Sequence, residues 1–136
     1  MRSHFILIFM LGMLIIGCKN KTTENPCIKN IIAQDELLGK VRNNICKTQS
    51  LSKAISDYTQ GMRHLILVGC PQEFNDAFET HIVAWENMIP IADKYPEERG
   101  EMHDIFDRIK AKSDKDFDDQ LQSIWDSWAQ VEKQFK

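Results

Sequence analysis

The sequence predicts an all-α protein, an up-and-down helical bundle of about four main helices with one shorter helix. Three observations support this fold class. Apolar residues recur every three or four positions in several segments, which is the spacing of one face of an α-helix. Glycine and proline separate these segments. No segment alternates apolar and polar residues as a half-buried strand would.

The first two helices are expected from about residue 28 to 46 and from about 50 to 68. The first is the weaker prediction because Gly39 lies inside it. Its apolar stripe consists of Ile28, Ile31, Ile32, Leu38, Val41 and Ile45. The stripe of the second helix consists of Leu51, Ile55, Tyr58, Met62 and Leu65. Gly69 and Pro71 then predict the end of that helix and the first position of the next.

The third helix has the longest apolar stripe. Pro90 lies within it and predicts a kink or an early end, and Tyr95-Pro96 closes the pattern. The stripe consists of Phe74, Ala77, Phe78, His81, Ile82, Trp85, Met88, Ile89 and Ala92.

A shorter helix and a C-terminal helix complete the prediction. Ser113 with Asp116 resembles a capping box at the start of the last helix. The shorter stripe consists of Met102, Ile105, Phe106 and Ile109. The last consists of Phe117, Leu121, Ile124, Trp128, Val131 and Phe135, with Trp125 widening it.

The N-terminal segment resembles that of a bacterial lipoprotein. The run from Phe5 to Ile16 is uncharged, and as a helix it would reach roughly 18 Å, short of the about 30 Å of a bilayer core. With Arg2 before it, the run has the pattern of a signal peptide. Ile15-Ile16-Gly17-Cys18 then resembles the lipobox, in which branched apolar residues precede a small residue and cysteine. The resemblance covers residues 1–18 and implies cleavage before Cys18 and acylation of its thiol.

This resemblance divides the chain into three parts and implies a location. Residues 1–17 are the signal peptide, 18–26 are the acylated cysteine with a polar tether, and 27–136 form a single helical domain. The acyl chains attach the protein to a membrane of the bacterial envelope. Lys19, where some lipoproteins have aspartate, favours the outer membrane, with the domain facing the periplasm.

The charges of the mature chain are distributed unevenly. Lys19 to Cys70 contains eight basic and four acidic residues, whereas Pro71 to Lys136 contains eight basic and sixteen acidic ones. Two interpretations follow: the two halves attract each other, or the acidic half meets a cationic envelope protein. No basic patch with interleaved aromatic residues is present in the sequence, so nucleic acid is not an expected partner.

Three cysteines remain once Cys18 is acylated. Two antiparallel helices of roughly 27 Å would return Cys27 and Cys70 to one end and leave Cys46 at the other. A disulfide requires Cα atoms within about 7 Å, so Cys27–Cys70 is the favoured pair in the oxidising envelope. The alternative is that all three thiols stay reduced.

His81 is the first candidate for chemistry because it lies on an apolar face. It is a candidate haem or metal ligand, with Met62, Met88 or Met102 as a soft partner. The alternative is a core histidine that is hydrogen-bonded to a hydroxyl or carbonyl group. Neither the C-x-x-C-H signal of attached haem nor the repeated Glu-x-x-His of di-iron bundles is present in the sequence.

Acidic clusters are the second candidate. Glu101, His103, Asp104 and Asp107, with Glu97 before them, form a stripe that is a candidate divalent-metal site or a solvated face. Asp114, Asp116 and Asp118 imitate a calcium loop, but Asp119 replaces its glycine and Trp125 its final glutamate. These carboxylates are better explained as anions in the first turn of a helix.

No catalytic arrangement is recognisable. Cys46 or Cys70 could pair with a histidine, but no nucleophile elbow or glycine-rich oxyanion loop accompanies them. We therefore expect a non-enzymatic binding or interaction module without a cofactor, and a small-ligand, haem or metal-binding bundle is the alternative.

Overall fold

The computed structural model describes residues 25–136. The predicted signal peptide, Cys18 and most of the predicted tether lie outside this range. Five helices form the described part: α1 Pro26–Ile45, α2 Leu51–Arg63, α3 Gln72–Ala92, α4 Met102–Lys110 and α5 Lys115–Glu132. No strand occurs in residues 25–136. The all-α prediction is confirmed.

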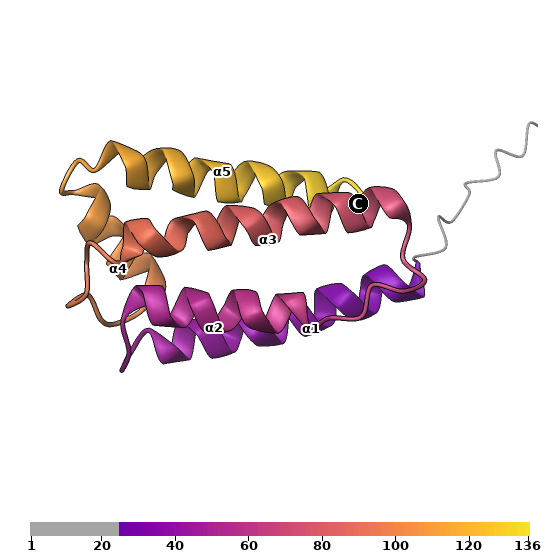
Figure 1. The fold of residues 1–136 in the computed structure, drawn as a ribbon, viewed down its shortest axis with the longest axis horizontal. Helices are drawn as coiled ribbons and strands as arrows, with labels where there is room; N and C mark the ends of the chain where they lie inside the picture. Colours follow the sequence, from indigo (N-terminus) through magenta and orange to yellow (C-terminus); the bar gives the residue numbers. More distant parts are fainter. Residues whose placement is uncertain (1–24) are drawn as a thin grey trace, which may run out of the picture.

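The four long helices run up and down, and α4 is the short connecting helix (Figure 1). Helix α1 packs on α2, α2 on α3, and α3 on α5. Short turns join α1 to α2 at one end of the molecule, and α4 lies at that same end (Figure 1). The segment from α2 to α3 crosses the opposite end, beside the start of α1 (Figure 1).

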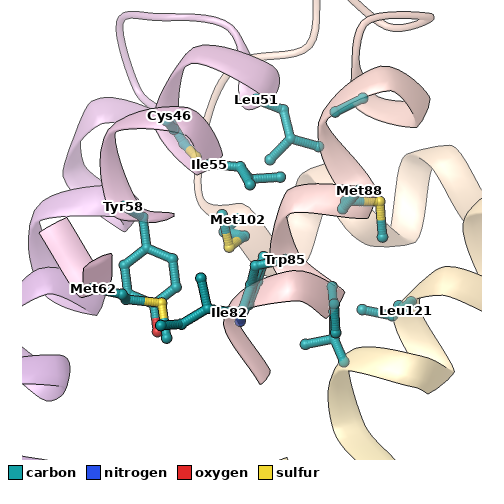
Figure 2. Packing of buried hydrophobic residues seen from close by; sticks show 14 of the residues in the cluster. Cys46, Leu51, Ile55, Tyr58, Met62, Ile82, Trp85, Met88, Met102 and Leu121 are labelled. Carbon is teal, nitrogen blue, oxygen red and sulfur yellow. The ribbon is translucent and has the colours of Figure 1, made fainter. Parts of the chain in front are cut away.

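The core is built from the predicted apolar stripes. Figure 2 shows side chains from α2, α3 and α5 converging, with Tyr58 and Trp85 inside the cluster. Figure 2 also shows Cys46, whose thiol is free and buried. Burying one such large apolar side chain contributes about 1.5–3 kcal/mol, so packing rather than helix propensity holds the bundle together.

Helix α1 differs from its predicted stripe. Val41, assigned to the apolar face, is exposed, whereas Asp35 is buried. The buried face continues from Ile28 and Ile31 through Asp35 toward Arg42, each step being three, four or seven residues. Two charged residues thus occupy core-facing positions of α1.

Helix α1 also begins inside the predicted tether. The side chain of Asn25 accepts hydrogen bonds from the backbone N–H groups of Cys27 and Ile28, and Pro26 is the first helical residue. This is a capped helix start, with proline where its missing N–H costs nothing.

Helix α2 ends at Arg63, five residues before the predicted end at 68. The predicted end was wrong because the apolar residues after Arg63 do not follow helical spacing: buried and exposed side chains alternate there. Leu65 and Leu67 pack against the core, while Ile66 and Val68 are exposed. Gly69, with φ of 91°, adopts a conformation that favours glycine.

The predicted cap of the last helix was off by one residue. Asp114, not Ser113, accepts hydrogen bonds from the backbone N–H groups of Asp116 and Phe117. At the other proline sites, Pro71 is the N-cap of α3 rather than its first residue, and α3 continues two residues beyond Pro90 before it ends.

A disulfide joins Cys27 to Cys70, with their Cα atoms 5.1 Å apart. This is the pair that antiparallel helix geometry favours. It connects the start of α1 to the residue that precedes Pro71. None of the helices in residues 25–136 combines the length and the apolar character that a membrane-spanning segment needs.

Candidate functional site

A cleft of about 310 Å³ lies in the middle of the bundle and receives side chains from all five helices. Clefts of this size that combine apolar walls with a few converging polar groups are the usual form of small-molecule sites. The lining residues are Asp35, Arg42, Tyr58, His81, Trp85, Met102, Phe106, Leu121, Ile124, Trp125 and Trp128.

Arg42 brings a positive charge into this cleft. Its guanidinium carbon lies 4.4 Å from the ring centroid of Tyr58 and 4.4 Å from that of Trp85. The two rings meet edge to face at 5.5 Å. Each cation–π contact is worth about 0.5–2 kcal/mol, more where water is excluded. Arg42 is thereby held between α2 and α3 although it belongs to α1.

Asp35 brings a negative charge to the same face of α1. The Tyr58 hydroxyl donates a hydrogen bond to its Oδ1 at 2.7 Å. Burial raises the pKa of the Asp35 carboxyl, and both this hydrogen bond and the nearby Arg42 charge oppose the rise. Burial also raises the pKa of the Tyr58 hydroxyl, helped by the Asp35 charge, so Tyr58 stays a donor. The cleft therefore contains a carboxyl group, Asp35, and a guanidinium group, Arg42, and both are held in place by neighbouring side chains.

His81 lies at the centre of a one-way chain of hydrogen bonds. The Trp85 indole N–H donates to His81 Nε2 at 3.2 Å, so Nε2 carries no proton. Nδ1, 2.8 Å from Ser127 Oγ, is then the donor nitrogen, and the Ser127 hydroxyl donates to the Ile124 carbonyl at 2.8 Å. Burial lowers the pKa of His81 to about 4, aided by the Arg42 charge. His81 is a neutral, oriented ring.

The remaining walls are aromatic. The Trp128 ring lies 5.2 Å from that of His81. Trp125 is 52% exposed, and the Lys110 ammonium stands 5.6 Å above its ring. All three tryptophans of the chain line this one cleft. Such walls suit a flat or apolar molecule.

Of the three methionines predicted beside His81, Met62 and Met88 do not share its cleft. Met62 and Met88 are buried core residues, do not line the cleft, and lie apart from each other (Figure 2). Met102 does line it. Both ring nitrogens of His81 have hydrogen-bond partners, which is the arrangement that the alternative interpretation, a core histidine, describes.

The acidic candidates also remain separate. Glu101 pairs with Lys47 at 2.8 Å, and His103 with Asp104 at 2.8 Å. Asp107 completes no site, since no three His, Cys, Asp or Glu side chains between residues 25 and 136 come together in an arrangement that could hold a metal ion. Asp114, the first carboxylate of the imitated calcium loop, caps α5 and accepts from the Tyr95 hydroxyl at 2.5 Å.

The acidic second half forms ion pairs both within itself and with the first half. Arg63 of α2 binds Glu79 and Glu86 of α3 at 2.8 and 2.7 Å. Glu98 binds Arg108 and Lys112 at 2.7 and 2.8 Å. Attraction between the halves, the first interpretation of the charge pattern, therefore operates at the α2–α3 surface and between Lys47 and Glu101.

No protein-family model, curated protein or solved structure matches this chain. Its function must therefore be inferred from the cleft. Sequence reasoning had not singled out Asp35, Arg42 or Tyr58 as site residues. A signal for the first two was present: both charges fall at core positions of an otherwise apolar helical stripe.

Proposed function

We propose that this protein is a lipid-anchored binding protein of the bacterial envelope that holds a small molecule in the cleft between its helices. One observation carries the proposal: a cleft walled by all three tryptophans contains a buried carboxylate and a guanidinium, both in contact with Tyr58 and the guanidinium also with Trp85. Polar groups arranged in this way fix the orientation of a bound molecule, and the aromatic walls supply the affinity.

The chemistry of the cleft defines the class of ligand. An aromatic or apolar body would stack between Trp125, Trp128 and Phe106. A polar end would meet Asp35 and Arg42, whose opposite charges suit a group that both donates and accepts hydrogen bonds. His81 offers only its ring face, because both of its nitrogens are occupied.

The membrane anchor is the second part of the proposal, and the N-terminal sequence supports it. Ile15-Ile16-Gly17-Cys18 follows an apolar run that is too short to span a bilayer. Two or more acyl chains on Cys18 would hold the domain stably at the outer membrane, on the periplasmic side. Catalysis is not part of the proposal.

The test is to identify what the protein carries. Mature protein is purified from envelopes in mild detergent and denatured, and the released small molecules are identified by mass spectrometry. We expect a molecule in near-stoichiometric amount with wild-type protein and its loss with Arg42→Gln. Arg63→Gln is the matched control, since Arg63 lies on the outside of α2 and pairs with Glu79 and Glu86.

Far-ultraviolet circular dichroism checks that both arginine variants fold. The proposal fails if folded wild-type protein releases nothing that the folded Arg42→Gln variant does not also release. Tryptophan emission provides a second measurement, because every tryptophan of the chain lines the cleft. Adding the identified molecule back should change the emission of wild-type protein and leave that of Arg42→Gln unchanged.

A further inference from the structure

The segment between α2 and α3, residues 64–71, exposes two large aliphatic side chains. Ile66 is 74% and Val68 is 88% exposed. Leu65 and Leu67, which alternate with them, pack against the core and hold the segment in place. No acidic residue occurs from His64 to Gln72. We call Ile66 and Val68 the apolar tip.

The apolar tip is fixed close to the point where the helical domain begins. The Cys27–Cys70 disulfide joins the segment to the first turn of α1, with 5.1 Å between the Cα atoms. Cys27 Sγ also lies 3.8 Å from the Val68 carbonyl oxygen. Figure 1 shows this segment at the end of the bundle where α1 starts, opposite α4.

The proposed anchor must lie near this end of the bundle. Asn25 is seven residue steps from Cys18, and at no more than 3.6 Å a step the chain between them reaches at most about 25 Å. A membrane that holds Cys18 is therefore always within that distance of the α1 start. The exposed tip would meet it at a high effective concentration.

We propose that Ile66 and Val68 insert into the membrane surface to which Cys18 is attached, so that this end of the bundle contacts the membrane. This inference rests on the lipid-anchor part of the proposed function. Side chains at such an interface enter about 5–10 Å, to the boundary of headgroups and acyl chains. The disulfide acts as the brace that keeps the tip beside the anchor. The α4 end then points away from the membrane.

The test places a reporter at the tip. Lipidated Val68→Trp protein is reconstituted into phosphatidylethanolamine–phosphatidylglycerol vesicles with and without dibrominated phosphatidylcholine, whose bromines quench nearby tryptophan. The emission of wild-type protein in the same vesicles is subtracted. Val41→Trp is the matched control: Val41 is 55% exposed and lies about 22 Å along α1 from Pro26.

We expect brominated lipid to quench the added emission of Val68→Trp at least about twofold more than that of Val41→Trp, because only the tip reaches the acyl boundary. Equal quenching of both would overturn the inference, as would quenching of neither. The intact mass of the same samples reports acylation. If Cys18 carries no acyl chains, the anchor and the inference are both overturned. The cleft proposal does not depend on this result, because ligand release from the cleft is measured in a separate experiment.

Discussion

The neutral state of His81 links the stability of the bundle to pH. Its pKa is lowered to about 4 in the folded protein from 6.5, chiefly by burial. Between these values the unfolded chain binds a proton that the folded chain does not, so stability falls as pH falls from 6.5 to about 4. The contribution of His81 is fully present above pH 6.5 and is on the order of 3 kcal/mol.

We predict that the part of the free energy of unfolding due to His81 falls by about 2 kcal/mol from pH 7 to pH 4.5. Urea unfolding of the Cys18→Ser chain and of its His81→Gln variant measures this part as their difference. The subtraction also removes the contribution of Asp35, whose raised pKa acts in the opposite direction. His103→Gln is the control, since His103 is exposed. Identical pH slopes with and without His81 would contradict the prediction.

The Tyr58–Asp35 hydrogen bond makes a second prediction at this scale. Removing the hydroxyl in Tyr58→Phe leaves a buried carboxylate without its donor, which costs about 1–3 kcal/mol of unfolding free energy at neutral pH. The same change should cost less in an Asp35→Asn background, because an uncharged amide needs that donor less. A double-mutant cycle by urea denaturation measures this coupling. Additive effects would show that the two side chains act separately.

Single residues of the cleft were the hardest features to predict from sequence. The apolar stripes placed His81 and Trp85 on one face of a helix, because helical spacing is enough to do so. Whether His81 has spare nitrogens depends on Ser127, 46 residues away, which only the packing of α3 on α5 brings to 2.8 Å. The Arg42 contacts with Tyr58 and Trp85 likewise join three helices. No local pattern encodes such contacts.

At the scale of elements, two helix glycines make a matched pair. A Cβ at Gly39 of α1 would meet only Arg42 Nη2, at 3.8 Å, whereas a Cβ at Gly61 of α2 would lie 2.6 Å from Leu38 Cδ2. Replacing a helix glycine by alanine is worth about 1 kcal/mol in propensity where there is room. Gly61 therefore lets α1 approach α2 closely.

We predict that Gly39→Ala raises the free energy of unfolding by about 1 kcal/mol and that Gly61→Ala raises it less or lowers it, because Leu38 must move. Urea denaturation of both variants and the parent measures the difference. In a Leu38→Ala background, where this clash is absent, Gly61→Ala should raise the free energy of unfolding relative to Leu38→Ala alone by its full propensity gain. An equal gain from both glycine substitutions would mean that the α1–α2 contact tolerates a methyl group.

Apolar periodicity predicted each helix, but it predicted the helix ends less accurately. All five helices lie where apolar stripes predicted them, since each stripe needs a partner face to bury. The end of α2 was missed because residues 65–68 are apolar enough to extend a helical stripe. In the structure their side chains instead alternate between the core and the exposed surface. The cap of α5 was missed because Ser113 and Asp114 are both good cap residues.

At the scale of the whole molecule, each end of the bundle is tied. At one end the Cys27–Cys70 disulfide joins the start of α1 to the segment before α3. At the other, the Gly100 N–H donates to the Cys46 carbonyl at 3.0 Å, and Lys47 pairs with Glu101. The cleft lies between these ties, so its walls are held at both ends.

The disulfide should supply much of the stability of this bundle. It links residues 43 apart, and closing a loop of that size removes chain entropy worth about 4 kcal/mol from the unfolded state. We predict that a reductant lowers the free energy of unfolding of the Cys18→Ser chain by about 2–4 kcal/mol, measured by urea denaturation.

Without reductant, a Cys27→Ala/Cys70→Ala variant should be as unstable as the reduced Cys18→Ser chain, and adding reductant should not change its stability. Cys46 provides the internal control, because it is buried, its thiol is free, and burial raises its pKa. A loss of stability on adding reductant to the double variant would contradict the prediction, because Cys46, its remaining cysteine, is a free thiol with no disulfide to reduce.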